Sequence, residues 1–219
     1  MLKGLDLSHH NKNMKNLADI NKYDFVILKA SEGKSYKDPF CKKWLSYLTT
    51  NSLKGFYHFA RPECGNSPEA EATNFLNAIS GVKKPFVIAL DVEAGALGFK
   101  KLDDWTFKWC DIVYKKTGIK PLIYCSESET IRFKKCANYS CGLWVAKWGT
   151  NKPKSIKPWE FWAFWQYTNN GVCSAVRVDE NYFNGNKDQF LKYAGVNDES
   201  ENSDTNNTTN RRVSASRKT

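Results

Sequence analysis

Four carboxylates directly follow apolar segments of the chain, and they are the first candidates for chemistry. They are Asp6, Asp91, Glu93 and Asp179. A carboxylate in such a position loses part of its hydration, so it requires either a cationic partner or a catalytic use. We therefore treat these four residues as candidate active-site acids.

Asp91 and Glu93 are two residues apart in the segment FVIALDVE. On an extended strand, residues i and i+2 point to the same face, roughly 6 to 7 Å apart along the backbone. Two carboxylates this close cannot ionise independently, and an acid beside a charged neighbour is the arrangement that glycoside hydrolysis needs. An isolated Asp-x-Glu can also cap a turn or pair with lysine, so this motif alone leaves both interpretations open.

Other predicted strand ends carry aromatic and amide side chains, namely Tyr57, Tyr124, Trp144 and Gln166. Aromatic rings suit the apolar faces of sugars, and hydroxyl and carboxylate groups suit their polar substituents. Each ring taken singly is also compatible with a core position. Their joint occurrence at strand ends indicates a carbohydrate-binding cleft.

The elements that must position these residues are short apolar runs. We expect strands at residues 2–7, 25–29, 55–59, 86–93, 121–125, 142–146, 163–167 and 175–179. Helical spacing occurs around 40–48, at 70–79 after a Ser-Pro-Glu start signal, and at 105–116 before a glycine. This alternation predicts an α/β fold with a parallel sheet, closed into an irregular barrel of about eight strands with fewer helices than strands.

The chain divides into one catalytic domain, residues 1–195, and a polar segment, residues 196–219, expected to be a disordered tail or linker. The charged residues of the tail cancel, so the net charge of +10 belongs to the domain. A basic domain favours a polyanionic partner such as nucleic acid, an acidic membrane or anionic cell-wall polymers. Because the lysines are scattered and no nucleic-acid-binding motif occurs, we expect no nucleic-acid partner.

Targeting signals are not evident in the sequence. The N-terminus lacks the apolar region of a signal peptide, and no apolar run approaches the roughly 18 residues of a membrane span. We therefore expect synthesis in the cytoplasm without a signal peptide, and no membrane insertion.

Cysteine and histidine are the side chains of this sequence most suited to bind a transition metal. The seven cysteines show no zinc-type or CxxC spacing, which predicts free buried thiols, although Cys136 and Cys141 are close enough to pair after release. His9, His10 and His58 have no metal-binding spacing either. No metal and no cofactor are expected.

The chain resembles glycoside hydrolase family 25, the Chalaropsis-type lysozymes, over residues 2–193. The motifs that carry the resemblance are, in order, GLDLS (4–8), VILKASEG (26–33), GFYHF (55–59), LDVE (90–93), PLIY (121–124), LWVA (143–146), WQYT (165–168) and VDEN (178–181). The resemblance implies a flattened barrel and cleavage of the β-1,4 bond between N-acetylmuramic acid and N-acetylglucosamine in bacterial peptidoglycan. One departure is His9-His10-Asn11 after Ser8, where many relatives carry a Gln-Gly-type sequence, and this loop could alter substrate preference.

The resemblance also implies roles for the site residues. Glu93 corresponds to the general acid and Asp91 to the residue that assists the other half of the reaction. Asp6 and Asp179 match two further active-site acids, whose charge would help to keep Glu93 protonated. The predicted substrate-binding residues are Tyr57, Tyr124, Trp144 and Gln166. We favour substrate-assisted catalysis with retention, with inversion and double displacement left open.

Three functions remain to be compared. The first, which we favour, is a muramidase that acts on the cell wall after release. A phage endolysin that crosses the membrane through a holin is favoured over a bacterial autolysin, because an autolysin ordinarily carries its own export signal. The second is a catalytically silent glycan-binding module, which predicts loss of Asp91 or Glu93, whereas both are present. The third is a chitinase-like glycosidase, which a comparison of chitin with peptidoglycan as substrates would separate from the first.

Overall fold

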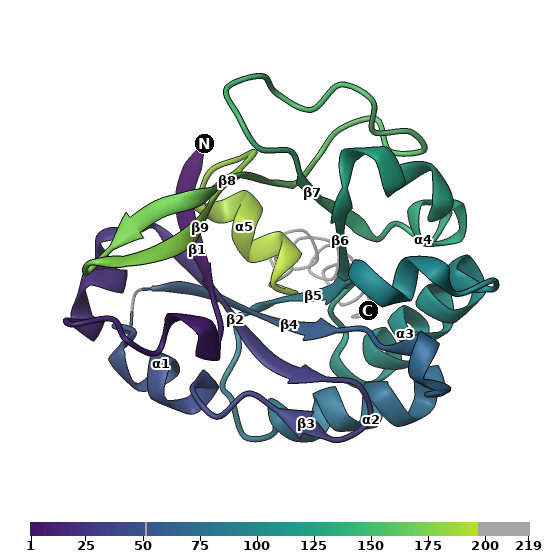
Figure 1. Ribbon diagram of the computed structural model, residues 1–219, viewed down its shortest axis with the longest axis horizontal. Coiled ribbons are helices and arrows are strands. Elements are labelled where there is room, and N and C mark those ends of the chain that lie inside the picture. The colour runs from purple at the N-terminus through teal and green to yellow at the C-terminus, as the bar shows by residue number, and fades with distance from the viewer. Residues whose placement is uncertain (51, 197–219) are drawn as a thin grey trace, which may run out of the picture.

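The chain forms a closed barrel of eight strands in the computed structural model, which describes residues 1–50 and 52–196 (Figure 1). The barrel order is β1, β2, β4, β5, β6, β7, β8 and β9, with β9 returning to β1, and the short β3 pairs with the edge of β2. The strands are β1 (Leu2–Leu7), β2 (Phe25–Glu32), β3 (Tyr36–Lys37), β4 (Leu53–Phe59), β5 (Val87–Asp91), β6 (Leu122–Ser126), β7 (Gly142–Ala146), β8 (Phe164–Cys173) and β9 (Val176–Phe183).

The α-helices are fewer than the strands among the described residues. They are α1 (Cys41–Tyr47), α2 (Pro68–Ala78), α3 (Leu102–Thr117), α4 (Lys134–Asn138) and α5 (Lys187–Tyr193), and short 3-10 helices occupy several loops. None of the helices in the described part combines the length and apolar character needed to cross a bilayer. The predicted fold class, an α/β barrel of about eight strands with fewer helices than strands, is confirmed.

The starts and ends of the helices follow their sequence signals. The Ser67 side chain accepts a hydrogen bond from the backbone N–H of Ala70, and Pro68 occupies the first turn of α2. Helix α3 ends at Gly118, whose φ of +73° lies in the left-handed region that favours glycine. The expected helices therefore occur where these signals place them, whereas α4 and α5 were not predicted.

One strand of the barrel contradicts the expectation of a parallel sheet. The barrel strands β1, β2, β4, β5, β6, β7 and β8 pair in parallel with their neighbours in this order, but β9 is antiparallel to both β8 and β1. Only Ser174 and Ala175 join β8 to β9, with φ of +48° and +64°. A connection of two residues with positive φ forms a hairpin and cannot cross over to a parallel strand. The hairpin was missed because neither residue is glycine or asparagine.

The core has two layers, one inside the barrel and one between the barrel and its helices. The inner layer contains Phe25, Phe164 and Phe183, and Phe190 of α5 packs against all three. Phe25 and Phe164 begin parallel strands and Phe183 ends the antiparallel one, so α5 closes the N-terminal end of the barrel. Figure 1 shows α5 across the barrel's centre. The opposite end of the barrel is left for the site.

The predicted division into a catalytic domain, residues 1–195, and a tail, residues 196–219, stays a prediction. The last element among the described residues is α5, which ends at Tyr193. The predicted tail, apart from Val196, lies outside the described residues.

Candidate active site

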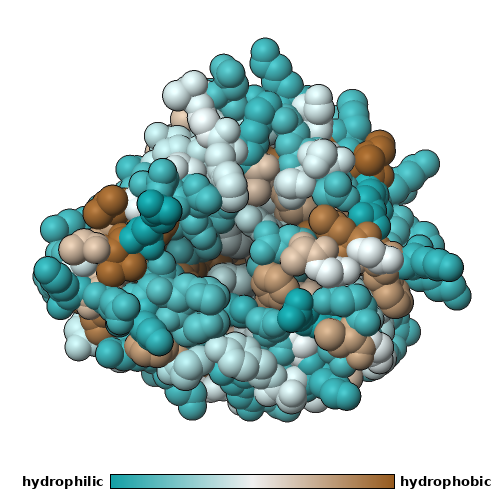
Figure 2. Space-filling view, in the orientation of Figure 1, coloured by the Kyte–Doolittle hydropathy of each residue, from teal (hydrophilic) through white to brown (hydrophobic). Residues whose placement is uncertain are grey.

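A polar pocket of about 210 Å³ lies at the C-terminal end of the parallel strands. Figure 2 shows the molecule hollowed near the centre of this face, with mainly hydrophilic residues around the hollow. All eight barrel strands contribute a lining side chain: Asp6 (β1), Lys29 (β2), Tyr57 (β4), Asp91 (β5), Tyr124 (β6), Trp144 (β7), Gln166 (β8) and Asp179 (β9). Glu93, just after β5, lines it as well. The pocket therefore contains every site residue that the sequence predicted.

The two-residue period of the strands explains this convergence. Val87, Ala89 and Asp91 share the inward face of β5, and Phe25, Ile27 and Lys29 share that of β2. In each strand the inward side chains are apolar near the closed end of the barrel and polar at the open end. The same alternation that builds the inner core thus delivers the functional groups.

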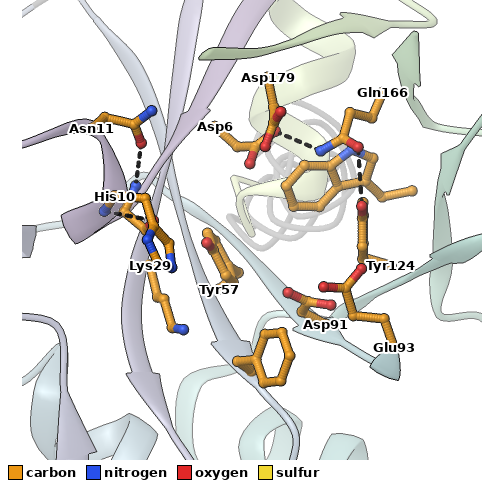
Figure 3. A pocket seen from close by; sticks show the side chains of 13 residues that line it. Asp6, His10, Asn11, Lys29, Tyr57, Asp91, Glu93, Tyr124, Gln166 and Asp179 are labelled. Carbon is orange, nitrogen blue, oxygen red and sulfur yellow. Dashed lines mark hydrogen bonds between the residues drawn. The ribbon is translucent and has the colours of Figure 1, made fainter. Parts of the chain in front are cut away.

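Asp91 and Glu93 form one pair of carboxylates in the pocket (Figure 3). The backbone of Glu93 is extended, with φ of −146°, so its side chain continues the inward face of β5. Burial, followed by the charge of Glu93, raises the pKa of Asp91 well above its ordinary range. Burial, followed by the charge of Asp179, raises the pKa of Glu93. Burial is the larger cause for Glu93, whereas the sequence-based expectation attributed the retention of its proton to the charges of neighbouring acids.

Asp6 and Asp179 form a second pair on the other side of the pocket (Figure 3). They are direct partners in the antiparallel register of β1 and β9. Burial and the charge of Asp179 raise the pKa of Asp6 well above its ordinary range, and burial raises that of Asp179 to about 6. The sequence analysis expected Asp179 at the end of a strand, but it lies within β9. It reaches the same end of the barrel because β9 runs in the opposite direction.

A hydrogen-bond network fixes the orientation of the Asp6 carboxylate. Its Oδ2 atom accepts from Gln166 Nε2 at 3.0 Å and from Asn181 Nδ2 at 2.8 Å. Gln166 Oε1 in turn accepts from the Tyr124 hydroxyl at 3.0 Å, and Asn181 Oδ1 accepts from Trp144 Nε1 at 2.8 Å. These hydrogen bonds hold three pocket-lining side chains in fixed orientations: Gln166, Tyr124 and Trp144. Trp144 forms the floor of the pocket.

Asp91 differs from Asp6 because its hydrogen bonds are incomplete. Its Oδ1 atom is buried and has no hydrogen-bond partner in the structure. A buried acceptor without a donor costs free energy, and a ligand N–H or O–H group in the pocket would satisfy it.

Lys29 brings a positive charge to the pocket, and the sequence analysis did not single it out. Its side chain is 6% exposed, and Nζ lies 2.6 Å from Glu32 Oε2. The ammonium group opposes burial by lowering the pKa of both Asp91 and Glu93. Its position two residues beyond Ile27, on the inward face of β2, was the signal that could have identified it.

Two further residues were missed. Asn181 lies two residues after Asp179 on the inward face of β9, so strand periodicity could have identified it. Trp148 lies beyond β7, is 61% exposed, and donates its indole N–H to Gln166 Oε1 at 3.1 Å. Trp144, by contrast, is only 2% exposed. An exposed ring beside the pocket is a better platform for a sugar than the buried floor, but no sequence signal distinguished the two tryptophans.

The loop after β1 reaches the pocket, as the sequence analysis expected. Ser8, His10 and Asn11 line it, and the Ser8 hydroxyl accepts from the backbone N–H of His10 to begin the 3-10 helix His9–Asn11. His9 contacts Asp38 instead, with Nδ1 to Oδ2 at 3.0 Å. Within residues 1–50 and 52–196, the group of side chains whose spacing suits a metal ion is a cysteine cluster outside this pocket.

Comparison with known proteins extends over most of the chain. Residues 5–176 match the model of the family described as glycosyl hydrolases family 25. The chain is 31% identical over 172 residues to the uncharacterized protein YegX of Escherichia coli O6:H1, covering 76% of this chain and 61% of that protein. It is 28% identical over 216 residues to lysozyme M1 of Streptomyces globisporus, covering 88% of this chain and 71% of that protein. The chain thus spans about three fifths of the length of YegX.

Solved structures agree with the fold. The bacterial lysozyme from Streptomyces coelicolor superimposes with a TM-score of 0.75 at 25% identity, over 89% of this chain and 97% of that one. The match of the family model, the barrel and the acids gathered at its open end lead to one conclusion: the chain belongs to family 25 of the glycosyl hydrolases.

Proposed function

We propose that the protein is a peptidoglycan hydrolase, an N-acetylmuramidase that cleaves the β-1,4 bond between N-acetylmuramic acid and N-acetylglucosamine. The observation that carries this proposal is the Asp91–Glu93 pair, whose pKa values are both raised, at the open end of the barrel. The names of two similar proteins, a Streptomyces globisporus lysozyme and a Streptomyces coelicolor lysozyme, support the same activity.

Glu93 is the general acid in this proposal. A raised pKa keeps its carboxyl group protonated closer to neutral pH, where it can donate that proton to the glycosidic oxygen. As the bond from C1 to that oxygen breaks, the leaving sugar keeps the proton. Glu93, now a carboxylate, then takes a proton from the water that completes hydrolysis.

Asp91 assists by orienting the substrate's own acetamido group. Its unpartnered Oδ1 atom can accept a hydrogen bond from the N–H of the sugar's 2-acetamido group. That contact orients the acetamido carbonyl oxygen to attack C1 and form a cyclic intermediate, and a carboxylate stabilises the positive charge of this intermediate. Water then opens the ring from the face that the leaving group vacated, so the product retains its configuration.

Aromatic residues position the sugars. Tyr57 and Tyr124 line the pocket beside the acids, where they can contact the acetamido group. Trp144 contributes the floor, and we add the exposed Trp148 as a stacking platform at the rim. Gln166 links this platform to Asp6 through hydrogen bonds at both ends of its amide.

Mass spectrometry of fragments released from purified peptidoglycan tests the proposal. After borohydride reduction, the wild type should release fragments that end in reduced muramic acid, and Glu93→Gln should release at least about a hundredfold less. Fragments that end in reduced glucosamine, or equal release by Glu93→Gln, would contradict the assignment. No release by either protein would favour a glycan-binding module, and faster turnover of chitin than of peptidoglycan would favour a chitinase-like enzyme.

We also propose that the enzyme is bacteriolytic and acts on the wall after release from the cell that makes it, as a phage endolysin does. The net charge of +10 supports attachment to anionic wall polymers. Loss of turbidity when the protein is added to intact Gram-positive cells tests this role, with Glu93→Gln as the inactive control. Hydrolysis of purified peptidoglycan without lysis of cells would refute it while leaving the muramidase assignment intact.

A further inference from the structure

Three cysteine side chains converge in the interior, outside the pocket. Cys110 lies in α3, Cys136 in α4, and Cys141 immediately precedes β7. Their sulfur atoms all lie within 4.8 Å of one another, and the residues are 0%, 0% and 2% exposed. All seven cysteines are free, and six are buried, whereas Cys64 is exposed, contrary to the expectation of buried thiols throughout. The convergence itself was not predicted, because it depends on how α3 packs against α4.

The backbone holds two of these sulfurs in place. A tight turn between Cys136 and Cys141 is closed by the Cys141 N–H, which donates to the Cys136 carbonyl at 3.0 Å. Ser140 within this turn has φ of +62°, a conformation that costs a non-glycine residue free energy. The Cys141 carbonyl accepts from Trp159 Nε1 at 2.7 Å. The turn and the hydrogen bond from Trp159 therefore fix the positions of the Cys136 and Cys141 thiols.

The surroundings of the three thiols supply a hydroxyl near one sulfur atom, a positive charge that compensates thiolates, and a cavity through which an ion can reach the cluster. The Thr106 hydroxyl lies 3.6 Å from the Cys136 sulfur. The ammonium group of Lys120 interacts electrostatically with Cys110 and Cys141. Cys141 also lines a cavity of about 290 Å³ with Trp159 and other side chains. Ligand number, outer contacts and access are the features by which a metal site is judged.

We propose that Cys110, Cys136 and Cys141 form a trithiolate site for one soft, three-coordinate cation, Cu⁺. Thiolates select Cu⁺, Zn²⁺ and iron–sulfur clusters, and the latter two ordinarily require four ligands. Within residues 1–50 and 52–196 the cluster contains no fourth cysteine, histidine, aspartate or glutamate. Each thiol that becomes a ligand releases its proton, and Lys120 offsets part of the negative charge that results.

Anaerobic titration of the full chain with Cu⁺, in competition with a coloured Cu⁺ chelator, tests the site. We expect one tightly bound Cu⁺ per chain, and X-ray absorption should show three sulfur neighbours and no nitrogen or oxygen. Cys110→Ala, Cys136→Ala and Cys141→Ala should each lower the affinity more than tenfold, since even outer contacts contribute tenfold or more. Cys125→Ala is the matched control, because Cys125 is equally buried but outside the cluster.

Several results would overturn the proposal. They are undiminished binding by the three variants, an equal loss of binding in Cys125→Ala, or four-coordinate Zn²⁺ that displaces Cu⁺ from the wild type. A disulfide within the cluster that persists under thiol reductant would also exclude the site. If the alanine variants do not fold, the wild type still decides, because Cu⁺ bound to the native state must raise Tm, and an unchanged Tm would refute the site. None of these readouts depends on glycosidase activity.

Discussion

Neighbouring acids in the pocket differ in their hydrogen bonding. Asp6 accepts two hydrogen bonds from amide groups, whereas Asp91 has a buried oxygen atom with no donor. A carboxylate held by two donors is already oriented before substrate arrives, and one that lacks a donor is available for a new contact. This difference is why we assign the acetamido contact to Asp91 and an electrostatic role to Asp6.

Removal of the charge of Lys29 should move the pH profile of activity. Lys29 lowers the pKa of both Asp91 and Glu93, so Lys29→Met raises both. Asp91 then needs a higher pH to ionise, and Glu93 keeps its proton to a higher pH. Both limbs of the kcat/KM profile should therefore shift to higher pH. Lys42→Met, which removes one charge from an exposed position in α1, is the control, and an identical profile for both variants would contradict this role.

Asp179 should make the protein less stable as pH rises. Burial raises its pKa from 3.8 to about 6, so the folded state binds a proton more tightly than the unfolded state does. The contribution of Asp179 to the free energy of unfolding is therefore most favourable below pH 3.8, and it is lost as the pH rises from 3.8 to about 6. Asp179→Asn should remove that decline and raise the free energy of unfolding at pH 7 by up to about 3 kcal/mol.

Urea unfolding at intervals from pH 4 to pH 7 measures this effect. The curves for wild type and Asp179→Asn should diverge as pH rises, and parallel curves would show that Asp179 carries no such penalty. A carboxylate that destabilises the fold yet lies in the pocket fits a functional role, because active sites commonly sacrifice stability.

At the scale of elements, the β8–β9 hairpin determines the composition of the site. Because β9 runs antiparallel, Asp179 comes opposite Asp6, and Asn181 comes within 2.8 Å of the same carboxylate. A parallel strand in this place would present the opposite end of its sequence to the pocket. The turn that reverses the chain is strained, since Ser174 and Ala175 both have positive φ.

Relief of that strain should stabilise the protein. Ala175→Gly removes the steric cost of a left-handed residue and should raise the free energy of unfolding by about 0.5 to 1 kcal/mol, after the added flexibility of the unfolded chain is subtracted. Ala78→Gly, in the last turn of α2, should do the opposite by about 1 kcal/mol. Denaturant titration of the two variants checks the sign, and a loss of stability in both would show that the turn is not strained.

At the scale of the whole molecule, the basic charge should control activity on intact walls. Exposed charges act over about 10 Å at 0.1 M salt and about 3 Å at 1 M. Turnover of whole walls should therefore fall as salt rises from 0.05 to 0.5 M, while hydrolysis of a short, uncharged glycan oligomer should change little. An equal salt dependence for both substrates would place the effect in the catalytic pocket rather than in wall attachment.

The sequence by itself determined the strands, their inward-facing acids and the family resemblance. These depend on local quantities: the two-residue period of strands such as Val87–Asp91, the start signal at Ser67-Pro68, and the residue types at strand ends. For that reason the residue types and their positions along the chain are sufficient to mark Asp6, Asp91, Glu93 and Asp179 as candidate acids.

Only the tertiary structure decided which of these groups are paired, buried or charged. The reversal of β9, the burial of Trp144 beside an exposed Trp148, and the approach of Lys29 to the acids arise from contacts between residues far apart in the chain. So does the convergence of Cys110 with Cys136 and Cys141. Spacing along the chain specifies which face of a strand a side chain occupies, but desolvation and charge depend on every element packed around it, and these set the chemistry.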